Sequence, residues 1–202
     1  MNYNFIAPYY HSLSQLIFLN RQHQAHFVIL KHLKENDKIL WVGGGAGKFI
    51  AEIEKLNLKL DIDYVDFSSK MIDLAKKEKT SHLNINFIVA DIFDFETDKK
   101  YDVVMTTFLF DHFNQPKAEE LFSQINSYLK VGGLWFYVDF VQNQKGWQKS
   151  VTNVMLSFFR IVIGLDISQL PKMKQSFTSY FEIVEHKFFF KKYIESIVYQ
   201  KK

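Results

Sequence analysis

From residue 38 onward, short apolar runs alternate with longer segments in which apolar residues recur every three or four positions. Short apolar runs are typical of strands that a parallel sheet buries on both faces, and the longer spacing is typical of helices. The alternation therefore predicts βα units wound on one sheet. The predicted strands of this part are 38–42, 60–65, 85–90, 102–106 and 134–139, and the predicted helices are 48–57, 69–79 and 115–129.

The last residues of the chain do not follow this alternation of strands and helices. Segments 181–190 and 194–200 are both predicted strands, and only residues 191–193 lie between them. A parallel crossover needs about a dozen residues or more, so this pair is antiparallel. The whole pattern predicts an α/β three-layer sandwich with a seven-stranded, mostly parallel sheet and an antiparallel last strand.

Two regions lie outside the βα core. Segment 9–33 has helical periodicity and contains neither Pro nor Gly. Segment 146–179 carries a helical apolar stripe, which predicts either a helix packed on the sheet or a lid over an apolar substrate. The stripe consists of Val151, Val154, Met155, Phe158, Phe159, Val162 and Ile163. We expect a single domain, 1–202, made of a helical prologue 1–36, a cofactor-binding core 37–140, a substrate-side insert 141–180 and a strand pair 181–202.

A glycine-rich segment, 43–47, follows the first strand. Its bare backbone can approach a ligand at the carboxyl edge of the sheet, where open α/β folds bind ligands. A phosphate-binding P-loop is excluded, because only three residues separate Gly43 from Gly47 and Phe49 stands where Ser or Thr is required. A dinucleotide fingerprint would have Lys48 at its third glycine position, which disfavours a nicotinamide cofactor without excluding it.

The spacing of Gly43, Gly45 and Gly47 after a strand resembles the first motif of class I S-adenosylmethionine-dependent methyltransferases. Four further segments resemble later motifs of that family, in the same order. They are 64–76, which begins Tyr-Val-Asp, 88–92 with its Ala-Asp pair, 101–106, and the Leu-Lys-Val-Gly-Gly-Leu turn at 129–134. The ordered series implies a Rossmann-like fold, S-adenosylmethionine as the cofactor and methyl transfer as the activity.

Two carboxylates follow neighbouring strands in this series. Asp66, 19 residues after Gly47, can accept hydrogen bonds from both hydroxyls of a ribose. The family places a residue like Asp91 against the exocyclic amine of adenine. Taken singly, either aspartate can equally be a helix N-cap or a turn residue. The implied cofactor-binding residues are Gly43, Gly44, Gly45, Gly47, Asp66, Phe67, Met71, Asp91, Ile92 and Thr106.

One position departs from the family pattern. Trp41 stands two residues before Gly43, where the family usually has an acid that orders the loop and holds the aminoacyl end of the cofactor. This departure keeps open an alternative to an enzyme, namely a non-catalytic binding or partner subunit with the same fold.

Methyl transfer from a sulfonium is an in-line displacement, so holding the two reactants in line can supply much of the acceleration. An acceptor that must lose a proton needs a base, and Asp111 and His112, just beyond the fourth strand, are the candidates. The alternative for His112 is a packing role. We expect a small, apolar or aromatic acceptor. Its predicted binding residues are Tyr9, Tyr10, Phe108, Asp139 and Phe158, in an apolar wall that also includes Phe110, Phe140 and Phe159.

The composition of the chain argues against several classes of partner and chemistry. Lys and Arg number 25 against 22 Asp and Glu, and no basic stripe interleaves with the aromatic residues, so we expect no nucleic-acid partner. The sequence contains no cysteine, which excludes disulfides and thiol chemistry, and its histidines lack the spacing of a metal site. No segment has the length of a membrane span and the first residues do not resemble a secretion signal, so we expect a cytoplasmic location. A monomer and a homodimer both stay open.

Overall fold

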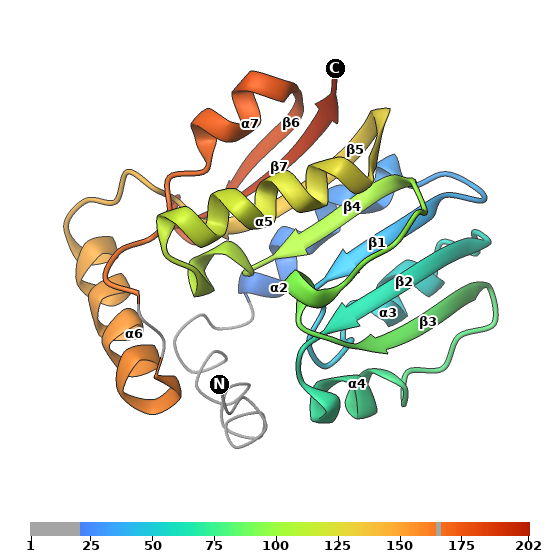
Figure 1. Ribbon diagram of the computed structural model, residues 1–202, viewed down its shortest axis with the longest axis horizontal. Helices are drawn as coiled ribbons and strands as arrows, with labels where there is room; N and C mark the ends of the chain where they lie inside the picture. Colours follow the sequence, from blue (N-terminus) through green and yellow to red (C-terminus); the bar gives the residue numbers. More distant parts are fainter. Residues whose placement is uncertain (1–20, 165–166) are drawn as a thin grey trace.

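The structure is a computed structural model that describes residues 21–164 and 167–202, and a seven-stranded sheet with helices on both faces forms its centre (Figure 1). The strands are β1 (Lys38–Val42), β2 (Leu60–Asp66), β3 (Leu83–Val89), β4 (Tyr101–Thr107), β5 (Leu129–Phe140), β6 (Phe181–Phe189) and β7 (Ile194–Lys201). Their order is β3-β2-β1-β4-β5-β7-β6. The pairs among the first five strands are parallel, and β7 is antiparallel to both β5 and β6. The predicted fold class is confirmed.

The helices are α2 (Arg21–His26), α3 (Ile50–Glu54), α4 (Ser69–Ala75), α5 (Gln115–Tyr128), α6 (Trp147–Ile163) and α7 (Lys174–Tyr180), with 3₁₀ turns η1 (Phe27–His32), η2 (Ile92–Asp94) and η3 (Phe110–His112). Helix α5 begins as predicted, because the Asn114 side chain accepts a hydrogen bond from the Lys117 amide and a proline lies in the first turn. Of the predicted prologue helix, residues 9–20 lie outside the described residues. No helix of the described part is long and apolar enough to cross a membrane.

Several elements differ from the sequence prediction, and helices α3 and α4 are shorter than the predicted 48–57 and 69–79. Strand β5 already begins at Leu129, which pairs with Tyr101, and a register shift before Val103 accommodates the glycine pair at 132–133. Helix α7 was not predicted. It is too short to be stable by itself, and the packing of Phe177 and Met173 into the core stabilises it.

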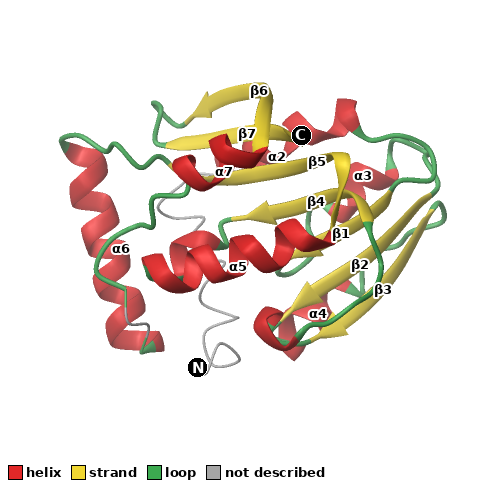
Figure 2. Ribbon diagram, turned by 45° about the horizontal axis from the view of Figure 1, so that its top comes forward, coloured by secondary structure: helices red, strands yellow, loops and turns green. Residues whose placement is uncertain are grey.

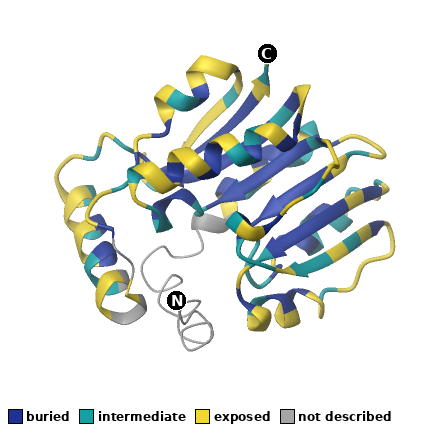
Figure 3. Ribbon diagram, in the orientation of Figure 1, coloured by how far each residue is buried: buried dark blue, intermediate teal, exposed yellow. Residues whose placement is uncertain are grey.

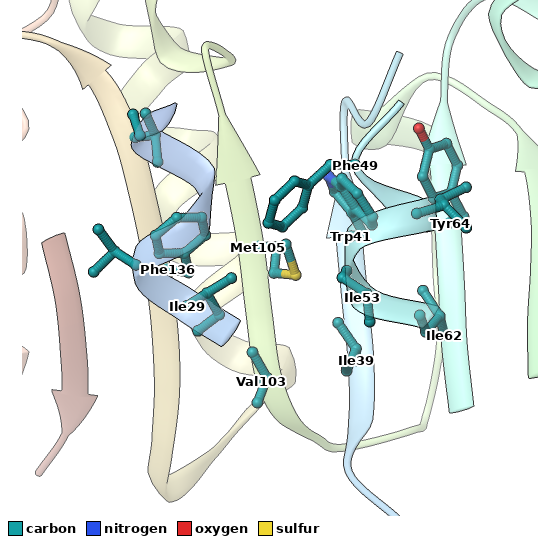
Figure 4. Packing of buried hydrophobic residues seen from close by; sticks show 14 of the residues in the cluster. Ile29, Ile39, Trp41, Phe49, Ile53, Ile62, Tyr64, Val103, Met105 and Phe136 are labelled. Carbon is teal, nitrogen blue, oxygen red and sulfur yellow. The ribbon is translucent and has the colours of Figure 1, made fainter. Parts of the chain in front are cut away.

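The side chains of β1 alternate between the two faces of the sheet. Ile39 and Trp41 belong to a first core cluster, which packs α2, α3 and α4 against one face, and Leu40 and Val42 belong to a second core cluster, beneath α5 and α7. Figures 2 and 3 show these layers and the buried strands between them, and Figure 4 shows part of the first core cluster around Trp41. All four side chains are at most 2% exposed, so β1 is buried on both faces.

Helix α6 lies beyond the carboxyl ends of the parallel strands (Figures 1 and 2). Its first turns dock on the turn between β6 and β7, where the hydroxyls of Thr152 and Tyr193 are 2.6 Å apart. Met155 and Leu156 are buried, whereas Val154 is 68% exposed. The predicted helix is confirmed, but the predicted apolar stripe is wrong at Val154, because only part of the helix surface meets the first core cluster.

Glu185 of β6 forms ion pairs that link η1 to the sheet. Its carboxylate lies 2.8 Å from the Lys31 ammonium, 2.7 Å from His32 Nε2 and 3.0 Å from the Lys187 ammonium. The hydrogen bond from Lys31 and then that from His32 lower the pKa of Glu185 to about 2 from an ordinary 4.5. A carboxyl whose pKa is lowered by folding stabilises the protein above its unfolded pKa, and this stabilisation is lost as the pH falls through the folded value.

We expect Glu185→Gln to reduce the free energy of unfolding by about 1 kcal/mol at pH 7, because the ion pairs are lost. The difference from the wild type should shrink as the pH falls from 4.5 to about 2, where the wild-type carboxylate takes up its proton. Urea unfolding at a series of pH values measures both effects. Glu182→Gln is the control, since Glu182 is exposed on the same strand and forms no ion pair with a described residue. Equal losses in the two variants would contradict the role of Glu185.

Candidate functional site

The glycine-rich loop connects β1 to α3 at the carboxyl edge of the sheet. The Gly43 amide donates to the Val65 carbonyl at 2.8 Å, and the Ile50 amide donates to the Gly47 carbonyl at 2.8 Å, so both ends of the loop are held. Gly45 has a φ of +62°, which favours glycine. A Cβ at Gly45 would meet no atom of the described residues within 4 Å, and the backbone is therefore open to a ligand there.

Asp66 ends β2 with its carboxylate against this loop. Its Oδ2 accepts a hydrogen bond from the Gly45 amide and its Oδ1 accepts one from the Ser68 amide, both at 2.9 Å. Burial raises the pKa of Asp66, and the hydrogen bonds from Ser68 and Gly45 and the charge of His112 offset this only in part. Each oxygen can accept a second hydrogen bond, so the carboxylate retains acceptor capacity for two hydroxyls of a ligand.

Asp91 lies between the neighbouring strand β3 and the turn η2, where it is the N-cap residue. Its carboxylate caps η2 by accepting a hydrogen bond from the Phe93 amide at 3.1 Å, which is the N-cap role that the sequence left open. The Ala90 amide donates to the Asp66 carbonyl at 3.1 Å. The structure therefore brings Asp66 and Asp91 to adjoining strand ends beside the glycine loop.

Two predicted cofactor residues, Thr106 and Ile92, are buried on the α5 side of the sheet. Thr106 is 1% exposed, and its hydroxyl accepts a hydrogen bond from the Trp135 indole at 2.8 Å. Ile92 is buried in the second core cluster, and its carbonyl accepts a hydrogen bond from the side-chain Nε2 of Gln124 at 2.8 Å. Both side chains lie on the side of the sheet opposite Trp41, and direct contact of either residue with a cofactor stays a prediction.

Phe67 and Met71 stay predictions. Phe67 directly follows Asp66 and is 45% exposed at the carboxyl edge. Met71 is half-buried in the first turn of α4, where its amide donates to the Ser68 hydroxyl at 3.3 Å.

Asp111 and Asp139 form a buried acidic pair where β4 and β5 end. They are 1% and 3% exposed, and Asp111 Oδ1 and Asp139 Oδ2 have no hydrogen-bond partner within the described residues. Burial raises the pKa of Asp111, and burial followed by the charge of Asp111 raises the pKa of Asp139 well above its usual range. Because each charge opposes ionisation of the other, the pair keeps a proton to a higher pH than an exposed aspartate does.

His112 lies beside this pair. Its Nε2 is 3.7 Å from Asp111 Oδ1, which is beyond hydrogen-bond distance, and its side chain is 14% exposed. The charge of His112 lowers the pKa of Asp111 and that of Asp66. The two predicted catalytic residues are therefore neighbours, His112 interacts electrostatically with the Asp66 carboxylate, and the catalytic role of both stays a prediction.

The predicted aromatic wall is divided by the sheet. The rings of Phe108 and Phe140 are 5.3 Å apart and lie with the half-buried Phe158 beside the first core cluster. Phe110 is 1% exposed in the second core cluster, 5.8 Å from the Tyr137 ring. A wall that includes Phe110 is therefore wrong, because its ring packs on the opposite face of the sheet. Tyr9, Tyr10 and the side chain of Phe159 lie outside the described residues.

Trp41 lies in the core and leaves the loop open. It is 1% exposed, and its ring packs against those of Phe49 and Tyr64 (Figure 4). Tyr64 also contacts the loop, which the sequence did not predict, since its hydroxyl donates to the Gly45 carbonyl at 3.0 Å. Two signals pointed to it. One is the additional glycine at position 44, between the motif glycines Gly43 and Gly45. The other is an aromatic residue, Tyr64, on the same face of β2 as Asp66.

The chain is similar in sequence to a methyltransferase family and to individual proteins of known sequence. Residues 39–133 match the family described as "Methyltransferase domain". The chain is 34% identical over 113 residues to malonyl-[acyl-carrier protein] O-methyltransferase 2 of Ilyobacter polytropus, covering 56% of this chain and 43% of that protein. It is 31% identical over 132 residues to carboxy-S-adenosyl-L-methionine synthase of Campylobacter fetus, covering 65% and 53%. The chain thus spans about half the length of these relatives.

The fold has solved counterparts. N-methyltransferase NodS from Bradyrhizobium japonicum, whose crystal structure holds S-adenosyl-L-homocysteine, superposes with a TM-score of 0.64 at 13% identity. The match covers 90% of this chain and 86% of NodS. At this identity the likeness shows a shared fold.

Residues 39–133 thus resemble the methyltransferase domains of S-adenosylmethionine-dependent enzymes, and the described residues share the fold of NodS. The residues of the site fit the adenosine half of the cofactor of these enzymes. The backbone at Gly45 is open, the Asp66 carboxylate keeps acceptor capacity, and Asp91 lies at the next strand end.

We expect alanine to affect Gly44 and Gly45 in different ways. A Cβ at Gly44 would overlap the Tyr64 ring, so Gly44→Ala should lower the melting temperature by several degrees. At Gly45 space is available and only the positive φ opposes alanine, at about 1 kcal/mol, but the methyl group enters the face open to a ligand. Gly45→Ala should therefore keep most of the stability and lose affinity for S-adenosylhomocysteine. Thermal unfolding and titration calorimetry measure both properties, and a larger loss of stability in Gly45→Ala would contradict this geometry.

Proposed function

We propose that this chain, as one domain over residues 1–202, transfers the methyl group of S-adenosylmethionine to a small molecule. The observation that carries the proposal is the Asp66 carboxylate held against the open backbone of Gly45 at 2.9 Å, beside Asp91 at the next strand end. The names of the two sequence relatives, a malonyl-[acyl-carrier protein] O-methyltransferase and a carboxy-S-adenosyl-L-methionine synthase, support chemistry on this cofactor.

The cofactor supplies an activated methyl group on a positively charged sulfur, which leaves as a neutral thioether. Asp66 accepts hydrogen bonds from the ribose hydroxyls, and Asp91 accepts one from the exocyclic amine of adenine. The loop at 43–47 offers backbone groups to the rest of the cofactor. Chain residues thus bind and orient the methyl donor, and orientation is the main requirement of an in-line displacement.

The acceptor is a small, apolar or aromatic molecule that binds at the carboxyl edge of β4 and β5. Support comes from the rings of Phe108, Phe140 and Phe158, which gather on the side of the first core cluster, and from α6, which lies beyond this edge. His112 accepts the proton that the acceptor loses. The charge of Asp111, 3.7 Å away, stabilises the resulting imidazolium.

Titration calorimetry with S-adenosylmethionine and S-adenosylhomocysteine tests the proposal, followed by transfer of a tritiated methyl group to a panel of phenols, amines and carboxylic acids. Asp66→Ala should weaken the affinity for S-adenosylhomocysteine by about 1 to 3 kcal/mol, because charge-assisted hydrogen bonds are lost. Because burial raises the pKa of Asp66, the affinity of the wild type should begin to fall at a higher pH than it would if Asp66 had the pKa of an exposed aspartate. Asp66→Asn should lack this fall.

Asp61→Ala is the matched control, since Asp61 is exposed on the same strand and contacts Asn84. An unchanged affinity in Asp66→Ala would remove Asp66 from the site. If the wild type binds neither compound, the proposed function is wrong. Binding without transfer to any acceptor would instead favour the non-catalytic binding subunit.

We expect His112→Gln to lower kcat about 100-fold for an acceptor that must lose a proton, since a positioned base contributes about that much. The affinity for S-adenosylhomocysteine should stay within about threefold of wild type. His186→Gln is the control, because His186 lies on β6 and pairs with Glu195 at 3.0 Å. Wild-type kcat in His112→Gln would assign His112 the packing role.

A further inference from the structure

Gly45 is held by one strand through both of its polar backbone atoms. Its carbonyl accepts a hydrogen bond from the Tyr64 hydroxyl at 3.0 Å, and its amide donates to Asp66 Oδ2 at 2.9 Å. Tyr64 and Asp66 are two residues apart on β2, so their side chains extend from the same face of the sheet. The two side chains therefore fix the position of Gly45 relative to the end of β2.

The Tyr64 ring is itself held tightly. Trp41, Tyr64 and Phe87 are register partners on β1, β2 and β3, and the ring of Tyr64 lies 4.9 Å from that of Trp41 and 5.4 Å from that of Phe87. Above the ring, Gly44 leaves the space that a Cβ would fill. The hydroxyl consequently reaches the loop from a ring that is fully buried, and close packing makes its position well defined.

Trp41 cannot hold the loop in the way that an acid at its position would. Its side chain is 1% exposed, and its indole N–H, which is a donor only, has no hydrogen-bond partner within the described residues. An acid among these rings would be buried without a counter-charge, which is unfavourable. The support for the loop therefore comes from β2.

We propose that Tyr64 is a positioning residue of the cofactor site, which orders the glycine loop from β2 in place of an acid at position 41. The proposal rests on the proposed function, because it concerns the same cofactor. Tyr64 acts through Gly45, whose amide holds the Asp66 carboxylate in place for the ribose. Burial, followed by the charge of Asp66, raises the pKa of Tyr64 well above its ordinary value, so the hydroxyl keeps the proton that it donates.

Tyr64→Phe tests the proposal, since it removes the hydroxyl and keeps the ring. The affinity for S-adenosylhomocysteine should fall about five- to tenfold, which corresponds to the loss of one hydrogen bond. Amide hydrogen exchange at Gly45 in the free protein, followed by NMR, should accelerate about tenfold. A variant with 4-aminophenylalanine at position 64 restores a donor at the same place and should recover both properties.

Tyr101→Phe is the matched control. The Tyr101 hydroxyl is also buried and donates to Asp63 Oδ2 at 2.7 Å, but Tyr101 lies at the amino end of β4. Tyr101→Phe should lower the melting temperature without changing either the affinity or the exchange at Gly45. Equal changes of both in the two variants would mean that Tyr64 only stabilises the fold.

A double-mutant cycle with Asp66→Asn gives an independent measurement. Because both side chains act on Gly45, the loss of affinity in the double variant should be smaller than the product of the two single losses. Independent losses, or wild-type affinity in Tyr64→Phe, would overturn the proposal. If the wild type binds no cofactor, the proposed function fails, and unaccelerated exchange at Gly45 in Tyr64→Phe would separately show that Tyr64 does not order the loop.

Discussion

The parallel register of β1 and β2 decides which side chains reach Gly45 in the glycine-rich loop. Trp41 pairs with Tyr64 and Val42 pairs with Val65, so β1 ends just where the last residues of β2 can reach the loop. A slip by one residue would turn Tyr64 and Asp66 to the other face and separate both from Gly45. Packing on both faces opposes such a slip, because it would exchange Tyr64 of the first core cluster with Val65 of the second.

The same register explains how the site tolerates Trp41, because it places this ring beside that of Tyr64. At a position where the family usually has an acid, the chain has a large aromatic residue whose ring completes the row with Tyr64 and Phe87. The row fills the first core cluster below the loop and aims one polar atom, the Tyr64 hydroxyl, at Gly45. Core packing and loop geometry thus depend on the same side chains.

Buried aspartates of this chain fall into two kinds. Asp63, in the middle of β2, accepts hydrogen bonds from Lys99, Tyr101 and Asn86, which lower its pKa although burial opposes this. Asp111 and Asp139, at the carboxyl edge, each have an oxygen without a hydrogen-bond partner in the described part of the chain. Satisfied buried groups are typical of structural roles, whereas raised pKa values at a strand edge are typical of functional sites.

The sequence by itself determined the sheet, the carboxyl ends of its parallel strands and the two aspartates at those ends, because burial on both faces leaves short continuous apolar runs that are readable along the chain. It also determined the start of α5, since Asn114 acts through a residue three positions away. Only the tertiary structure decided that Thr106 and Ile92 are buried on the α5 side of the sheet, that Phe108 and Phe110 lie on opposite faces, and that Tyr64 supports the loop. Each of these depends on which face a side chain meets across neighbouring strands, and contacts between residues distant in the chain leave no local pattern.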